Sequence, residues 1–83
     1  MTFEDWKATR ERVQCVNIIE DQFGYLPEGA EAAVVYDPGV VAELKDGRYF
    51  THIGRSEYTG TLDELEQRLW DEHAKHEVGG CES

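Results

Sequence analysis

The chain has 83 residues and a net charge of −10, from 18 Asp and Glu against 8 Lys and Arg. This length predicts one domain with a limited core, and 40% hydrophobic residues argue against a disordered body. No apolar run approaches the length of a membrane span, and the first residues lack the basic and apolar pattern of a signal peptide. We therefore predict a single cytoplasmic domain over residues 1–83, with a frayed tail at residues 78–83.

The first segment has the pattern of a helix. Thr2 followed by Asp5 resembles a capping box, which predicts that a helix begins at Phe3. Apolar residues then recur at helical spacing, and Gly24 is typical of a helix C-terminus. We predict one helix of about 20 residues here. The alternative is a strand after a short helix, because residues 13–19 are rich in β-branched side chains.

The middle of the chain predicts three antiparallel strands. Asp46-Gly47 is typical of a two-residue hairpin turn of type I′, and Asp37-Pro38-Gly39 fits a type II turn. A further short strand around Tyr58 is an alternative to a polar connection over residues 54–60. The three expected strands cover residues 30–36, 40–45 and 48–53.

The hairpin turn fixes an expected register between the second and third strands. In that register, Leu44 lies opposite Tyr49, and side chains alternate between a core face and a wetter face. The pairs expected on the core face are Leu44 with Tyr49, Ala42 with Thr51, and Val40 with Ile53. The residues expected on the wetter face are Val41, Glu43, Lys45, Arg48, Phe50 and His52.

The last segment predicts a second helix. Thr61 followed by Glu64 forms a capping box, and Leu62, Leu65 and Leu69 lie along one face. A three-stranded sheet cannot bury its apolar face alone. We therefore expect an α+β domain with a three-stranded antiparallel sheet and the N- and C-terminal helices packed on one face. Its order is helix, strand, strand, strand, helix, with Trp6 and Trp70 filling the space between the layers.

The residues with metal-binding or nucleophilic chemistry do not form a convincing site. Those with metal-ligand chemistry near the C-terminus are His73, His76, Glu77 and Cys81, but a structural zinc site needs four ligands closed around the metal. Neither Cys15 nor Cys81 has the basic surroundings that activate a thiol. Two cysteines predict either two reduced thiols or a single bridge. We predict a protein that is not an enzyme, with no catalytic residue, cofactor or metal.

The acidic residues of the last helix are the best candidates for a binding site. Residues 61–83 hold seven acidic residues against two basic ones, which is half of the net charge of the chain. Four of the acids point away from the leucine stripe, so they are available to the Lys and Arg residues of a partner. An ordinary solvated helix face is the alternative. The predicted partner-binding residues are Asp63, Glu64, Asp71 and Glu72.

In size, charge, α/β layout and acidic terminal helix, the chain resembles the small acidic inhibitors encoded by phages and mobile elements, the anti-CRISPR proteins and other DNA mimics. The resemblance is to the class and rests on no sequence motif. It implies stoichiometric binding to a CRISPR-Cas or other nucleic-acid-binding complex through a basic surface, without direct contact to nucleic acid. The alternative is a small cytosolic accessory or scaffolding domain that acts through homodimer or other protein contacts, with Val41, Phe50 and His52 as its interface.

Overall fold

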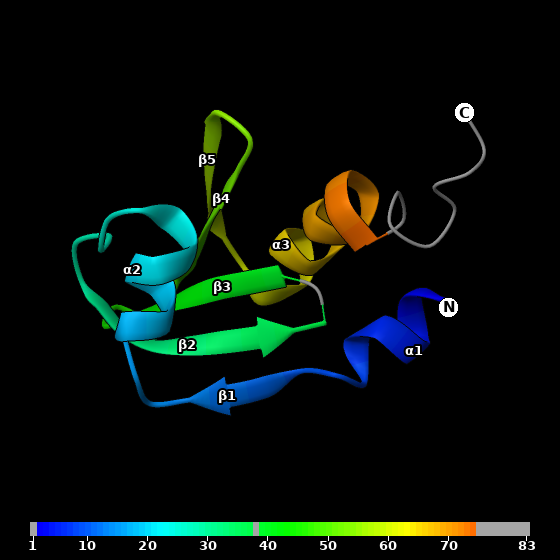
Figure 1. The fold of residues 1–83 in the computed structure, drawn as a ribbon, viewed down its shortest axis with the longest axis horizontal. Coiled ribbons are helices and arrows are strands. Elements are labelled where there is room, and N and C mark those ends of the chain that lie inside the picture. The colour runs from blue at the N-terminus through cyan, green and yellow to red at the C-terminus, as the bar shows by residue number, and fades with distance from the viewer. Residues whose placement is uncertain (1, 38, 75–83) are drawn as a thin grey trace.

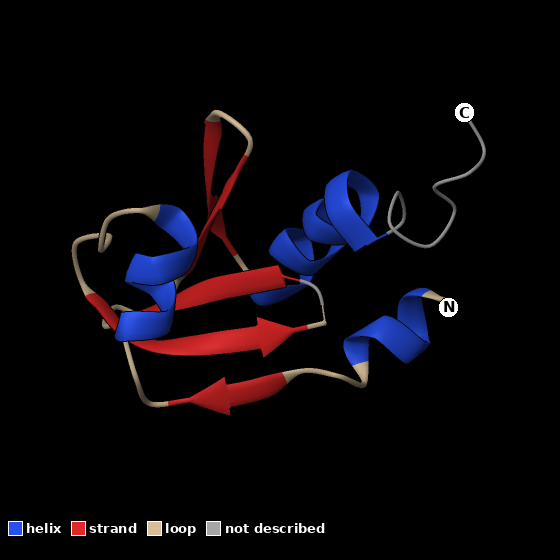
Figure 2. Ribbon diagram, in the orientation of Figure 1, coloured by secondary structure: helices blue, strands red, loops and turns tan. Residues whose placement is uncertain are grey.

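The computed structural model describes residues 2–37 and 39–74, which form an α+β fold built on one antiparallel sheet (Figure 1). Helices lie around the sheet and are joined to it by short loops (Figure 2). In chain order the elements are α1 (Phe3–Lys7), β1 (Glu11–Val13), α2 (Asn17–Phe23), β2 (Ala30–Tyr36), β3 (Gly39–Leu44), β4 (Tyr49–Ile53), β5 (Ser56–Gly60), α3 (Leu62–Leu69) and the π-helical turn η1 (Trp70–Ala74).

The sheet has five strands in the order β1-β2-β3-β4-β5, all antiparallel. The prediction of a three-stranded sheet is therefore wrong, although the α+β class holds. β1 and β5 extend the three expected strands at either edge. The short strand considered around Tyr58 is β5, which the Gly54-Arg55 turn folds back onto β4. Gly54 has a φ of 62°, and Arg55 is not among the described residues with a positive φ, all of which are glycines. This combination is the one that a type II′ hairpin turn requires.

The first segment is not one helix. Thr2 caps α1 as predicted, since its hydroxyl accepts a hydrogen bond from the Asp5 backbone N–H, but α1 stops after five residues. The chain then forms β1, in which Arg12 lies opposite Val34 of β2. Pairing with β2 overrides the helical spacing of the apolar residues. The alternative of a strand after a short helix is right in kind, but the strand ends at Val13, where it was expected to begin, and a second helix, α2, follows it. Gly24 ends α2 with a φ of 84°, as predicted.

The β3–β4 hairpin differs from the expected register by one residue. Glu43 lies opposite Tyr49 and Ala42 opposite Phe50. The N–H of Gly47 donates to the carbonyl of Leu44, and the N–H of Leu44 to that of Arg48. The loop therefore contains three residues, with Gly47 at a φ of 92°. This is the arrangement of a type I turn followed by a left-handed glycine bulge, which uses the same Asp-Gly pair as a two-residue turn.

A one-residue shift exchanges the faces of the two strands relative to each other. The expected grouping of side chains is therefore wrong. Each β4 side chain shares a face with the β3 side chains that were predicted to lie on the other face. Val41 shares a buried cluster with Ile53, whereas Val40 and Ala42 share another with Phe50 packed against it. Because both clusters are apolar, neither side of the central strands is a wet face.

The two clusters show that helices cover both faces of the sheet. On one face, α1 and α3 pack on the sheet around Trp6, which is fully buried and stacks on Tyr36 with 4.5 Å between ring centroids. On the other face, α2 inserts the fully buried Ile19 against Ala33 and Ala42. The prediction that the N- and C-terminal helices pack on one face holds for α1 and α3, but α2, which was expected to be part of the N-terminal helix, covers the other face.

The last helix begins as predicted. Thr61 and Glu64 form a capping box, and Leu65 and Leu69 are 1% and 2% exposed. Beyond Leu69, the helix widens into the π-helical turn η1, which places an i→i+5 hydrogen-bonding pattern where an α-helix was expected. The predicted frayed tail, residues 78–83, lies outside the described residues.

Candidate functional site

The four predicted partner-binding residues are all exposed, on α3 and η1. Asp63 and Glu64 lie in the first turn of α3, where the helix dipole favours negative charge. Asp71 and Glu72 lie in η1, and Asp71 accepts a 3.2 Å hydrogen bond from the side-chain amide of Gln67. The structure thus places all four on one helical segment and leaves their carboxylates accessible to a partner.

The opposite side of this segment is held firmly against the sheet. Leu65 and Leu69 are buried among residues of β2, β3 and β4, with Leu62 and Trp70 packed around them. Because the inner face of α3 is fixed by the core, its acidic outer face has a defined position before any partner binds. Preorganisation of this kind reduces the entropy lost on binding.

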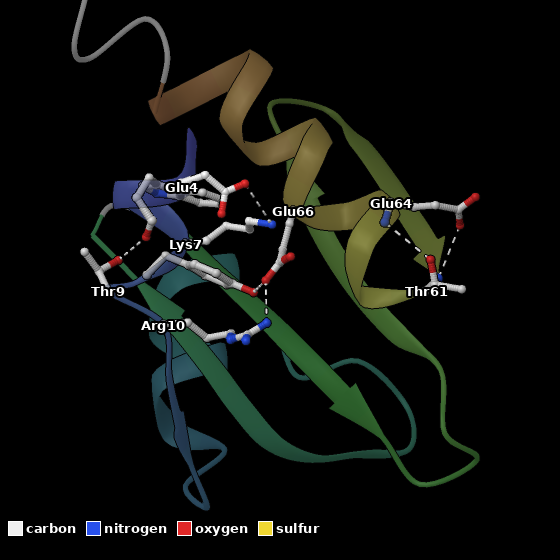
Figure 3. A network of polar contacts seen from close by, with 9 residues as sticks. Glu4, Lys7, Thr9, Arg10, Thr61, Glu64 and Glu66 are labelled. Atoms are coloured by element: carbon white, nitrogen blue, oxygen red, sulfur yellow. Dashed lines mark hydrogen bonds and ion pairs between the residues drawn. The ribbon is translucent and has the colours of Figure 1, made fainter. Parts of the chain in front are cut away.

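Glu64 also stabilises the helix on which it lies. Its carboxylate accepts a 3.2 Å hydrogen bond from the Thr61 backbone N–H, and its own N–H donates to the Thr61 hydroxyl at 3.3 Å (Figure 3). A substitution at Glu64 therefore removes part of the helix cap as well as a surface charge. Asp63, Asp71 and Glu72 have no role in this cap.

One acid of α3 lies in the core rather than at the surface. Glu66 is 1% exposed and reaches from α3 towards Arg10 (Figure 3). Its carboxylate accepts a 2.6 Å hydrogen bond from the Tyr36 hydroxyl and a 2.9 Å hydrogen bond from the Arg10 guanidinium, through the same oxygen. Arg10 stays half-exposed. The buried charge is therefore neutralised by a cation that retains contact with water.

In the sequence, Glu66 counted only as one of the seven acidic residues in residues 61–83, and sequence reasoning missed this role. A signal was present, because Glu66 follows Leu62 by four residues and precedes Leu69 by three, and so lies on the leucine stripe. An acid in that position either breaks the apolar face or is paired in the core. Its partners come from β2 and from the segment between α1 and β1, which are distant in the sequence.

The surroundings of Tyr36 keep its hydroxyl protonated. Burial raises the pKa of Tyr36 far above its ordinary value, and the hydrogen bond that it donates to Glu66 raises it further. The hydroxyl is thus a fixed donor at neutral pH. We interpret the contacts among Arg10, Tyr36 and Glu66 as an anchor that holds α3 on the sheet, and we call them the Glu66 anchor.

Much of the basic charge in the described residues is already paired with acids. The ion pairs are Lys7 with Glu4, Arg10 with Glu66, Arg12 with Glu43, and Arg48 with Asp46. Arg68 instead lies over the Tyr58 ring, 4.3 Å from its centroid. Since the carboxylates on the outer face of α3 are in none of these ion pairs, they remain available to an external cation.

Two clefts lie beside β5, one on each side of the sheet. The cleft between β5 and α3 has a volume of about 370 Å³ and is lined by Tyr58, Thr59, Glu64, Leu65, Gln67 and Arg68. The cleft on the α2 side has a volume of about 310 Å³, and its lining includes Tyr25, Phe50, Glu57 and Thr59. Thr59 borders both, so β5 forms the wall between them.

A group of aromatic side chains lies at the cleft on the α2 side. Phe23 and Tyr25 meet Phe50 and His52 with ring centroids 5.7–6.4 Å apart. The Tyr25 hydroxyl donates a 2.6 Å hydrogen bond to Glu57 of β5. Burial and this hydrogen bond raise the pKa of Tyr25 to about 12, so the hydroxyl remains a donor at neutral pH.

The interface considered for an accessory domain does not exist as predicted. Phe50 contacts Phe23 at the end of α2, and His52 contacts Tyr25 just beyond it. Val41 is instead fully buried on the other face of the sheet. The one-residue register shift separates them. The homodimer alternative therefore loses the surface on which it was based.

The residues with metal-binding chemistry are only partly described. Within residues 2–37 and 39–74, no group of three or more His, Cys, Asp and Glu side chains is arranged to hold a metal ion. Of the cluster considered from the sequence, His73 lies in η1, and His76, Glu77 and Cys81 lie outside the described residues. Cys15 is a half-buried free thiol, and the possible bridge to Cys81 also falls outside the described part.

Comparison of the chain with protein families, with curated proteins and with solved structures finds no match. None of the helices in the described part of the chain is long and apolar enough to cross a membrane.

Proposed function

We propose that this protein is a small cytoplasmic binding protein without enzymatic activity, cofactor or metal. It acts as a stoichiometric inhibitor that binds a basic surface of a nucleic-acid-binding protein or complex, in the manner of anti-CRISPR proteins and other DNA mimics. The observation that carries the proposal is the placement of Asp63, Glu64, Asp71 and Glu72. All four are exposed on a helical segment whose inner face is fixed in the core.

The electrostatics favour such a partner. A groove that binds phosphates attracts carboxylates by the same long-range field, and the chain carries a net charge of −10. The same charge repels nucleic acid itself. Because the Glu66 anchor and the two buried leucines hold α3 on the sheet, its carboxylates meet a partner as a rigid array rather than as a flexible acidic tail.

The experiment reverses charge without disturbing the helix cap. The test variant is Asp71→Lys with Glu72→Lys, which leaves Glu64 and its capping box in place. The matched control is Glu20→Lys with Asp21→Lys, two exposed acids of α2 on the opposite face of the sheet. Both double variants change the net charge by the same amount, so a difference between them reports position and not total charge.

The partner is captured from bacterial lysate on immobilised wild-type protein at low and high salt and then identified and purified. We expect the association rate with that partner to fall about tenfold for the α3 variant and much less for the α2 control, since steering depends on charges near the interface. We also expect association to slow with rising salt, and duplex DNA to compete. Equal rates for the two variants, or binding that DNA does not affect, would contradict the proposal.

A further inference from the structure

The two edges of the sheet differ in how they are protected. β1 is only three residues long and carries the charged residues Glu11 and Arg12, which are common ways of preventing an edge from pairing with another chain. β5 is five residues long and holds a single charged residue, Glu57. Among the described residues, β5 is hydrogen-bonded to a strand on one side only. Its other side therefore presents backbone N–H and C=O groups to a further strand.

The two clefts border β5 on opposite faces of the sheet, next to the edge that an added strand would occupy. Side chains of a strand alternate between the two faces of a sheet. On the β5 edge, one set of side chains would face the cleft next to α3, and the alternate set would face Glu57 and Thr59, the β5 residues that line the cleft on the α2 side. An edge strand with a receptive cleft on each side is the arrangement by which a sheet binds an extended peptide.

The chemistry of the cleft on the α2 side indicates what it would accept. Glu28 and Glu57 contribute carboxylates, and Tyr25 and Phe50 contribute aromatic rings. Among the described residues that line this cleft, Arg48 is the cation, and it donates hydrogen bonds of 2.7 Å and 2.9 Å to the Asp46 carboxylate. Carboxylates and aromatic faces together favour a Lys or Arg side chain.

The cleft next to α3 has a mixed lining. Tyr58 and Leu65 line it together with Thr59, Glu64, Gln67 and Arg68, and Arg68 lies over the Tyr58 ring. Because this lining contains both an acid and a base, it favours a small uncharged side chain over a charged one of either sign. The two clefts thus predict a segment in which basic residues alternate with apolar ones.

We propose that the edge of β5 binds an extended segment of a partner protein, in which basic and apolar residues alternate, by adding it to the sheet as a further strand. This goes beyond the function proposed above, because it concerns the sheet edge and not the outer face of α3. A second copy of this chain is a poor occupant, since two chains of net charge −10 repel one another and β5 would bring two copies of Glu57 together.

The probe is a synthetic peptide of alternating lysine and valine, titrated into isotope-labelled protein and followed by NMR. Its control is the same peptide with alternate backbone amides methylated, which keeps the charge but cannot complete the backbone hydrogen bonds. We expect chemical-shift changes centred on β5, with slower exchange of the outward amides of Glu57 and Thr59. Methylation should weaken binding by about tenfold.

A pair of variants tests the same edge from the side of the protein. Ile53 and Ser56 flank a two-residue turn and pair with each other, so the alternation of the ladder points the N–H groups of residues 57 and 59 away from β4. Thr59→Pro removes one outward donor, which an edge strand tolerates, and Thr59→Val keeps it. We expect only the proline variant to lose about tenfold in peptide affinity.

The peptide comparison requires no variant, so it remains decisive if Thr59→Pro does not fold. Equal affinity for the methylated peptide, with shifts spread over all acidic surfaces, would overturn the proposal. Slow exchange of the Glu57 and Thr59 amides in the free monomer would also overturn it, because the edge would already be covered. A concentration-dependent dimer that pairs through β5 would assign the edge to a second copy instead.

Discussion

The hydroxyl of Tyr36 donates a 2.6 Å hydrogen bond to the carboxylate of Glu66, joining the end of β2 to the buried side of α3. Both residues are almost completely buried, at 4% and 1% exposure. A buried carboxylate is costly unless its oxygens are hydrogen-bonded and its charge is paired. Tyr36 supplies a hydrogen bond to the carboxylate, and Arg10 supplies the opposite charge. The position of the acidic outer face of α3 thus depends on a polar contact within an apolar core.

The Glu66 anchor predicts a non-additive double-mutant cycle. Glu66→Leu leaves the buried Tyr36 hydroxyl without the acceptor for its proton, so we expect it to lower the free energy of unfolding by about 1–3 kcal/mol. Tyr36→Phe alone should cost a similar amount. The double variant should cost less than the sum, because neither group is then left unsatisfied. Urea denaturation of the four proteins measures the cycle, and additivity within about 0.5 kcal/mol would show that the two residues act independently.

Stability at alkaline pH should depend on Tyr36. Its pKa is raised in the folded state above the ordinary value of 10.0, chiefly by burial. Above about pH 10 the unfolded chain releases this proton while the folded chain keeps it. The contribution of Tyr36 is therefore complete below about pH 10 and is lost as the pH rises, by up to about 1.4 kcal/mol per pH unit.

The comparison that isolates this effect uses Tyr36→Phe, because Tyr25 also has a raised pKa. Chemical denaturation of both proteins from about pH 9 to pH 12 should give a shallower decline for the variant. Parallel curves would mean that Tyr36 does not remain protonated in the folded state.

Gly47 should be difficult to replace for reasons of backbone conformation alone. Its φ is 92°, and a β-carbon built there would meet no atom within 4 Å. Gly47→Val should therefore cost about 1–3 kcal/mol through backbone strain, and Gly47→Asn should cost less, since Asn enters the left-handed region more readily. Thermal or urea unfolding ranks the two. If Val and Asn had equal effects, the left-handed conformation would not be the limiting factor.

Local signals in the sequence were sufficient for the ends of several elements. The Thr2 cap, the capping box of Thr61 and Glu64, and the Gly24 stop each depend on a few neighbouring residues, and the structure confirms all three. The burial of Leu65 and Leu69 followed from spacing along one helix. In each case, the interaction that determines the feature lies within the segment itself.

Features set by distant contacts could not be read in this way. The segment that became β1 has no strand pattern of its own and is extended because β2 lies beside it. Asp46-Gly47 fits both a two-residue turn and the three-residue turn that forms, and only the packing of both faces of β3 decides between them. The apolar run at Val40, Val41 and Ala42 was the available sign of burial on both sides.

The candidate site shows the same difference between features set by local contacts and features set by distant ones. The exposure of Asp63, Asp71 and Glu72 followed from the helical pattern and is found in the structure. The clefts beside β5 were not foreseen, because they are formed by residues from the loop between α2 and β2 and from β3, β4, β5 and α3 that meet only in the folded chain.

The coverage of the sheet by helices on both faces limits the substitutions that its centre tolerates. In β3, Val40, Val41, Ala42 and Leu44 are all buried, so successive side chains that point in opposite directions enter apolar surroundings. A polar residue at any of these four positions would lose its hydration without gaining a partner. In β5, by contrast, Ser56, Glu57 and Thr59 are exposed. The tolerance of the sheet to substitution therefore increases from the central strand towards the β5 edge. Residues at that edge can change to fit a new partner without disturbing the core.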